Sequence, residues 1–311
     1  MALHPVVKTM IDAIRQAGRP QLSDGTPEDA RALVAAGRKA LGSGPAVGAT
    51  SEVSIATRDG SVPGRLYRTV DPESGLIIYL HGGGWVVGTP DDFDAMARVL
   101  AVRSGCALLM VDYRLAPEHP FPAGLHDVED AIRWSAAHCA DLAGGTVPIV
   151  VAGDSAGANL AAVAALALKN EMKLALQLLF YPVTDCDTDT SSYRSYGSDY
   201  PLTRRDMQWF FGHYAAEHLM RDPRIAPLRA TDLKGAPPAW IATAEYDVLR
   251  DEGEAFATRL SEAGVSVHLH RYAGMPHGFA RMMNLVDTAD QSLDDAAAAV
   301  ARACAVPRDH T

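Results

Sequence analysis

Cysteine is scarce in this 311-residue chain, which has four: Cys106, Cys139, Cys186 and Cys304. No two of them form a C-x-x-C pair, and their spacing matches no zinc-binding pattern. We therefore expect ordinary thiols in a reducing compartment, with no metal site and no cofactor.

Positive charge and long apolar runs are lacking as well. There are 28 Lys and Arg against 38 Asp and Glu, a net charge of −10, which argues against a general binder of nucleic-acid phosphates. No apolar run reaches membrane length, and the first 20 residues contain no continuous apolar stretch of the signal-peptide type. We expect a cytoplasmic protein that neither spans a membrane nor binds nucleic acid.

The N-terminal segment has helical periodicity instead. Four apolar residues of its first 20 positions fall at helical spacing: Val7, Met10, Ile11 and Ile14. A second helix is opened by Thr26 as its cap and Pro27 in its first turn. We interpret residues 1–50 as N-terminal cap helices that end in a Gly-rich linker.

The remainder of the chain predicts an α/β fold. Residues 51–70 alternate polar and apolar positions around Asp59-Gly60, which is typical of a β-hairpin. Short apolar runs then alternate with helical stretches, a pattern typical of a mostly parallel central sheet with helices on both faces. The predicted strand runs are residues 75–80, 106–113, 147–154, 174–182, 238–245 and 265–274. We assign residues 51–183 and 221–311 to this main domain.

Residues 184–220 interrupt the alternation. They are rich in aromatic residues and contain one stripe at helical spacing: Met207, Phe210, Phe211, Tyr214 and His218. One interpretation is a helix packed on the core. The other, which we favour, is a cap insertion that covers a site at the sheet edge together with the N-terminal helices.

Catalytic chemistry is indicated most strongly by Gly153-Asp154-Ser155-Ala156-Gly157, a G-x-S-x-G motif between a predicted strand and a predicted helix. A tight turn there strains the backbone of Ser155 and makes its hydroxyl project outward. The residues two before and two after crowd each other, so both must be small. We therefore expect Ser155 to be a nucleophile at a helix N-terminus.

A serine nucleophile needs a base and an acid that orients it. His277 lies in a Gly/Pro loop after the last predicted strand and is our candidate base. Asp247 follows the strand run 238–245 and is our candidate acid, with Glu245, Asp251 and Glu252 as competitors. We expect His81 to brace a loop.

The sequence His81-Gly82-Gly83-Gly84-Trp85 follows a buried strand run, and its glycines let the backbone come close to a bound group. Acyl transfer develops an oxyanion that fixed N–H donors must meet. We expect the amides of Gly82, Gly83 and Ala156 to form that hole. A phosphate site fits poorly, because the loop lacks the Gly-Lys-Ser/Thr ending of a P-loop and is not a G-x-G-x-x-G turn.

The motifs HGGGW, DYRLAPEHPFPA, GDSAGANL, AEYDVLRDEG and GMPHGF, in this order, resemble those of the bacterial hormone-sensitive-lipase-like carboxylesterases. The resemblance runs from about Val53 to Phe279, and it implies the α/β-hydrolase fold with a helical cap. It also implies that Ser155 is the nucleophile, His277 the base and Asp247 the acid, with no metal. Many members of that family have proline after the acid, whereas this chain has Val248.

The predicted function is hydrolysis of short- to medium-chain acyl esters through an acyl-serine intermediate. Alternatives are lactone or amide hydrolysis or acyl transfer on the same triad, and a ligand-binding relative without catalysis. Our candidate pocket walls are Trp85, Trp209, Phe210 and Leu249.

Two further expectations concern structure. In the proline-rich segment after residue 113, we expect Arg114 and Glu118 to pair with each other beneath the glycine loop. The clean alternation around Val265–Tyr272 is typical of an edge strand, which could pair with its copy in a homodimer.

Overall fold

A computed structural model describes residues 2–305 of the chain. Its strands form one eight-stranded sheet in the order β1-β2-β4-β3-β5-β6-β7-β8. Strand β2 is antiparallel to both of its neighbours, and β4, β3, β5, β6, β7 and β8 run parallel. The strands are β1 (Ala49–Thr57), β2 (Gly60–Arg68), β3 (Leu76–Leu80), β4 (Ala107–Val111), β5 (Ile149–Asp154), β6 (Leu176–Phe180), β7 (Ala239–Tyr246) and β8 (Val267–Pro276). The mostly parallel sheet predicted from the sequence is confirmed.

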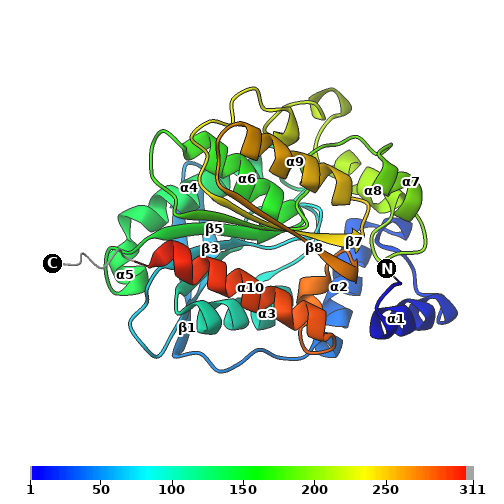
Figure 1. Cartoon of the computed structure of the whole chain (residues 1–311), viewed down its shortest axis with the longest axis horizontal. Helices are drawn as coiled ribbons and strands as arrows, with labels where there is room; N and C mark the ends of the chain where they lie inside the picture. Colours follow the sequence, from blue (N-terminus) through cyan, green and yellow to red (C-terminus); the bar gives the residue numbers. More distant parts are fainter. Residues whose placement is uncertain (1, 306–311) are drawn as a thin grey trace.

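Helices lie on both faces of this sheet, as the alternation predicted. Figure 1 shows α4, α6 and α9 on one side of the sheet and α3 and α10 on the other. The helices are α1 (Pro5–Gln16), α2 (Pro27–Leu41), α3 (Pro90–Ser104), α4 (Ala123–Ala137), α5 (Cys139–Ala143), α6 (Ala156–Leu168), α7 (Ser191–Tyr196), α8 (Arg204–Tyr214), α9 (Arg250–Glu262) and α10 (Asp287–Cys304). Short 3-10 helices are η1 (Leu22–Asp24), η2 (Glu217–Leu219), η3 (Pro227–Arg229) and η4 (Phe279–Met282).

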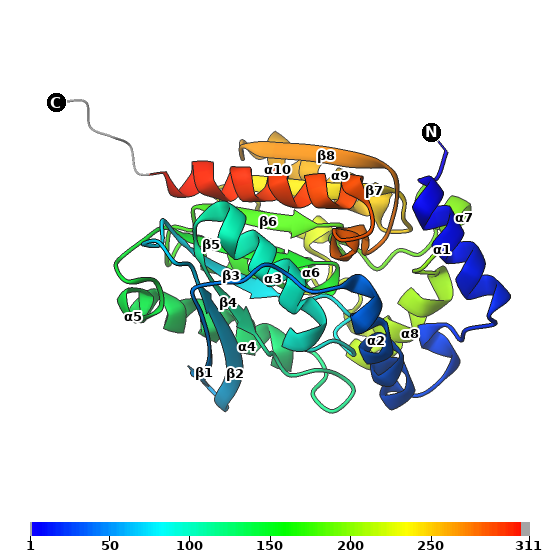
Figure 2. The same cartoon turned by 90° about the horizontal axis from the view of Figure 1, so that it is seen from below.

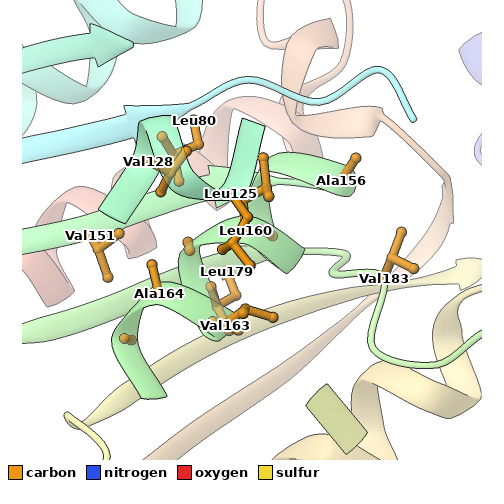
Figure 3. Close-up of a cluster of buried hydrophobic side chains, with 14 of the residues drawn as sticks. Leu80, Leu125, Val128, Val151, Ala156, Leu160, Val163, Ala164, Leu179 and Val183 are labelled. Carbon is orange, nitrogen blue, oxygen red and sulfur yellow. The ribbon is translucent and has the colours of Figure 1, made fainter. Parts of the chain in front are cut away.

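Burial follows the position of each strand in the sheet. Every residue of β3, β4 and β6 is buried, because helices cover both faces. The core between α6 and the sheet is made of aliphatic side chains such as Leu80, Leu160 and Leu179 (Figure 3). Four consecutive residues of β8, from 268 to 271, are exposed, so β8 is an edge strand as the alternation predicted.

The predicted hairpin is present, with one shift in the turn. Thr57 pairs with Gly60, so the turn residues are Arg58 and Asp59, one position earlier than the Asp59-Gly60 pair expected. Gly60 begins the second strand with φ +129°.

Helices α1, α2, α7 and α8 gather at the end of the molecule to which the parallel strands point (Figures 1 and 2). Thr26 caps α2 by accepting from the amide of Asp29, and Thr203 caps α8 in the same way through Asp206. Asp206 also accepts a hydrogen bond from the amide of Ser23 (3.1 Å). Residues 1–50 and 184–220 are thus joined to each other above the sheet.

The aromatic stripe of the insertion is shorter than expected. Met207, Phe210, Phe211 and Tyr214 are buried on α8. His218 is exposed and lies in η2, because the chain becomes extended at Ala215 (φ −153°, ψ 159°) and α8 ends there.

Candidate active site

Ser155 lies in a strained turn between β5 and α6. Its φ of +54° and ψ of −119° are rare for a residue with a side chain. A Cβ on Gly157 would lie 2.0 Å from the carbonyl oxygen of Leu80, and a Cβ on Gly153 would lie 2.5 Å from the carbonyl carbon of Gly157. Only glycine therefore fits on either side of the turn, for the steric reason expected from the motif.

His277 and Asp247 complete a hydrogen-bonded relay with this serine. The distance from His277 Nε2 to Ser155 Oγ is 2.9 Å, and that from His277 Nδ1 to Asp247 Oδ2 is 2.7 Å. Because a carboxylate can only accept, Nδ1 carries the proton and Nε2 is left to accept the serine proton. Asp247 is 1% exposed, and its other oxygen accepts from the amide of Leu249 (3.0 Å).

The three competing acids serve the surrounding loops. Glu245 accepts from the amide of Gly274, and Asp251 accepts from the amide of Ser192. Glu252 is buried and accepts from the amides of Thr184 and Asp185; burial raises its pKa well above the usual range. Asp247 is thus the acid that bonds to His277, and the other three hold backbone amides.

The glycine loop departs from the expectation at Gly82. The Gly82 amide donates to Asp154 Oδ1 (2.8 Å), and the same oxygen accepts from the Tyr79 hydroxyl (2.9 Å). Asp154 precedes Ser155 directly, so this bond fastens the loop to the nucleophile turn. Since its N–H is already bonded, assigning Gly82 as an oxyanion donor is wrong.

The amides of Gly83 and Gly84 have no acceptor within residues 2–305, and both glycines line the cavity at Ser155. Gly83 has φ +123°, and a Cβ there would lie 2.0 Å from the carbonyl oxygen of Val87. Gly84 has φ +58°, and a Cβ there would lie 2.2 Å from the ring of Phe210. The amide of Ala156 heads α6, where the first N–H groups of a helix lack partners. Free donors are therefore available from Gly83, Gly84 and Ala156.

His81 supports this loop from below. Its Nδ1 donates to the carbonyl of Gly82 (2.7 Å), and its ring stacks on Phe93 and Tyr113 with centroid distances of 5.3 and 4.7 Å. Desolvation in this buried position lowers the pKa of His81 to about 4. His81 is therefore neutral at neutral pH and acts as a brace, as expected from the sequence.

A cavity of about 240 Å³ opens above Ser155 and His277. Its walls include apolar side chains from residues 1–50, from residues 184–220 and from other segments of the chain: Leu22, Val34, Leu41, Phe93, Leu202, Met207, Phe210 and Met282. Leu22 and Val34 were not selected from the sequence, because helical periodicity shows which face of a helix is apolar but not what that face meets.

Of the four expected pocket walls, Phe210 alone lines this cavity. Trp85 is buried and stacks on Tyr214 of α8 at a centroid distance of 4.2 Å. Trp209 packs against Phe210 and His213, and Leu249 is buried beside Asp247. Trp85, Trp209 and Leu249 are therefore packing residues, and assigning them as walls is wrong.

Arg114 and Glu118 have structural partners but do not pair with each other. Arg114 binds the buried Asp127 (Nη2 to Oδ1 2.7 Å), and Glu118 binds Arg31 of α2 through two contacts of 2.7 Å. Arg31 also donates to the carbonyl of Val86, in the segment after the glycine loop (2.9 Å). Arg31, which sequence analysis did not select, links an N-terminal helix to this loop.

Within residues 2–305, no cluster of three or more His, Cys, Asp and Glu side chains is placed to hold a metal ion. Over the same residues, none of the helices has the combined length and apolar character needed to cross a membrane.

Comparison with known proteins agrees with this geometry. A family profile described as "alpha/beta hydrolase fold" matches residues 77–281. The chain is 39% identical over 252 residues to an ethyl acetate hydrolase of Pseudomonas putida, covering 78% of this chain and 79% of that protein. It is 41% identical over 236 residues to the carboxylesterase NlhH of Mycobacterium tuberculosis, covering 73% of each.

Solved structures give the same result. A hyperthermophilic esterase from the archaeon Pyrobaculum calidifontis superimposes with a TM-score of 0.93 at 34% identity, covering 98% of this chain and 100% of that one. A thermostable esterase from Pseudomonas putida also gives 0.93, at 32% identity and 98% coverage of both chains. The resemblance inferred from the motifs is confirmed, and the chain belongs to the α/β-hydrolase fold family.

Proposed function

We propose that this protein is a serine carboxylic ester hydrolase that acts through an acyl-serine intermediate. The observation that carries the proposal is the relay from Ser155 through His277 to Asp247, which opens into a largely apolar cavity. The names of relatives such as ethyl acetate hydrolase and carboxylesterase support the reaction class.

In the first half-reaction, His277 Nε2 takes the Ser155 proton as Oγ attacks the ester carbonyl. Asp247 holds the imidazole in the required tautomer and offsets the positive charge that develops on it. His277 then gives the proton to the leaving alcohol. In the second half-reaction, His277 activates a water molecule that releases the acid and restores Ser155.

The oxyanion formed in each half-reaction would be met by the amides of Gly83, Gly84 and Ala156. Support comes from the lack of acceptors for the two glycine amides and from the place of Ala156 at the N-terminus of α6. Asp154 positions this hole, because it holds the Gly82 amide while its own backbone continues into Ser155.

We assign residues 1–50 and 184–220 to a cap over the site, and residues 51–183 and 221–311 to the catalytic domain. The Ser23–Asp206 bond and the Arg205–Asp24 ion pair (2.8 Å) support a cap made of both segments. A cavity of about 240 Å³ suits acyl groups of short to medium length.

The test is hydrolysis of 4-nitrophenyl butyrate by the Ser155→Ala and His277→Ala variants. Each should lose at least about a thousandfold in kcat while circular dichroism and melting temperature stay near the wild type. A phosphonate probe should label the wild type at Ser155, as read by mass spectrometry, and should not label Ser155→Ala. A wild type that is inert to both ester and probe would contradict the proposal and favour a ligand-binding relative.

A panel of acetyl, butyryl and octanoyl esters, a lactone and an anilide separates ester hydrolysis from lactone and amide hydrolysis. Adding a second alcohol to the assay detects acyl transfer. If the protein is a hydrolase of short-chain esters, its kcat/KM should be highest on the acetyl or butyryl ester.

We also propose that the protein is cytoplasmic and forms a homodimer through β8. All four cysteines are free thiols, which supports a reducing compartment: Cys106, Cys139, Cys186 and Cys304. The exposed edge of β8 supports the dimer.

A further inference from the structure

Arg281 is the charged side chain nearest in sequence to His277 that reaches the candidate site. It lies in η4, four residues after His277, and its side chain lines the cavity that contains Ser155. The same side chain lines a second cavity of about 610 Å³, whose walls include residues of α2 and α3. Leu41 also borders both cavities. Arg281 and Leu41 therefore stand between the site and this outer cavity.

The guanidinium of Arg281 has few partners. Nη2 donates to the backbone carbonyl of Asp92 (3.0 Å), and the group lies over the Phe93 ring, 4.4 Å from its centroid. Nε is buried and has no hydrogen-bond partner. In the described part of the chain, no carboxylate lies within ion-pair distance of Arg281. A buried N–H without an acceptor is costly, so the group has capacity for an additional acceptor.

The other charges at the two cavities are mostly satisfied. The four aspartates that line them each accept from an arginine side chain or from a tyrosine and a backbone amide: Asp91, Asp92, Asp94 and Asp154. Lys39 lines the outer cavity, and no carboxylate among residues 2–305 pairs with it. At these two cavities, Arg281 and Lys39 are thus positive side chains without an ion-pair partner among residues 2–305, while Asp154 is a buried carboxylate whose hydrogen-bond donors are neutral.

We propose that Arg281 determines specificity for esters that carry a free carboxylate, such as the monoesters of short dicarboxylic acids. The proposal rests on the ester hydrolase proposed above and names its substrate class. The ester carbonyl would lie at Ser155 while the carboxylate at the far end of the acyl chain meets the guanidinium. Arginine binds carboxylates through charge-assisted hydrogen bonds, and apolar surroundings strengthen the attraction.

A different role for Arg281 would be to offset the charge of Asp154. The positive charge of Arg281 lowers the pKa of the Asp154 carboxyl, although burial raises that pKa more. If this were its whole role, removing Arg281 would disturb the glycine loop and impair every ester equally. A specificity residue instead affects the carboxylate-bearing ester selectively.

The experiment compares two esters of equal length, monoethyl glutarate and ethyl pentanoate, by pH-stat titration of the acid released. We expect Arg281→Gln to lower kcat/KM for monoethyl glutarate at least tenfold more than for ethyl pentanoate, mainly through KM. Arg281→Lys keeps the charge but not the planar fork of donors, so its ratio of the two kcat/KM values should lie between those of the wild type and Arg281→Gln. It also tests the proposal if the glutamine variant does not fold.

Arg302, exposed near the C-terminal end of α10, provides a control with the same loss of charge. Arg302→Gln should leave the ratio of the two kcat/KM values unchanged. If Arg281→Gln leaves the ratio of the two kcat/KM values unchanged, whether both activities fall equally or neither falls, the proposal is overturned. A wild type that hydrolyses neither ester would instead contradict the proposed function.

Discussion

Residues that do not touch a substrate decide whether the glycine loop has the right shape. His81 is fully buried, and its one N–H bonds to Gly82, the residue that also donates to Asp154. Tyr113 donates to the carbonyl of His81 (2.7 Å) and stacks on its ring. The loop is thus held from three sides, by an imidazole, a carboxylate and a phenol. Protonating the imidazole would place an uncompensated charge in this core.

The pKa of His81 therefore makes stability depend on pH. Its pKa is about 4 in the folded protein and about 6.5 when exposed in the unfolded chain. Between these values the unfolded state binds the proton and the folded state does not, so stability falls as the pH drops from 6.5 towards 4. From pH 7 to pH 5 this one group should lower the free energy of unfolding by about 2 kcal/mol.

The measurement is urea unfolding at pH 7 and pH 5 for the wild type and His81→Gln. Glutamine can donate to Gly82 but does not titrate over this range. The wild type should therefore lose about 2 kcal/mol more than the variant between the two pH values. Equal losses in the two proteins would show that His81 is not the group responsible.

The same residues show where prediction from sequence stops. Ser155, Asp247 and His277 can be selected because each residue type stands at a strand end in a recognisable motif. The choice among the glycine amides cannot be made that way, because the acceptor for Gly82 is Asp154, 72 positions along the chain. Trp85 was misassigned for a related reason: its position after the glycines suggested the site, but its backbone turn (φ +61°) directs the chain into the core under Tyr214.

Elements were predictable wherever one pattern determined them. The buried strands and the helices between them follow from apolar runs and amphipathic spacing. The end of α8 did not follow, because the helical spacing continues to His218 while the chain leaves the helix at Ala215.

Helix α6 packs unusually close to the sheet. Small residues at its first turn let Gly157 approach the carbonyls of Leu80 and His81.

The same Gly→Ala substitution should have opposite effects on stability in α6, which makes this contact, and in α8, which has open space at its glycine. In Gly157→Ala of α6 the new Cβ would lie 2.0 Å from Leu80 O, so β3 and α6 must separate. We expect a loss of about 3 kcal/mol or more in the free energy of unfolding. In Gly212→Ala of α8 the new Cβ meets nothing within 4 Å. Alanine there should raise stability by roughly 0.5–1 kcal/mol, because glycine is the more flexible residue in a helix.

Thermal and urea unfolding of both variants provide the measurement, with expression in the soluble fraction as a first indication for Gly157→Ala. A Gly157→Ala protein as stable as the wild type would mean that α6 can move away from β3 without cost. A destabilised Gly212→Ala protein would mean that the space beside Gly212 on α8 is not open, contrary to the structure.

At the scale of the whole molecule, the two edges of the sheet differ. Edge strands of soluble proteins commonly carry charges or proline, which block pairing with another chain. Strand β1 carries Glu52, which is exposed and pairs with Arg65. The exposed part of β8 is residues 268–271, where the one arginine, Arg271, pairs with Glu254 of α9 and Leu269 is 40% exposed. Of the two edges, β8 is the one suited to pairing with a second copy.

We therefore expect a dimer in which two β8 strands meet across a two-fold axis. Light scattering after size exclusion should give twice the 33.1 kDa of the chain. Leu269→Lys places like charges near each other at such an interface and should yield the monomer. Because Leu269 does not line the cavity at Ser155, the monomer should keep ester hydrolysis within about twofold of the wild type. A wild-type monomer at working concentration, or a Leu269→Lys dimer, would rule out pairing through β8.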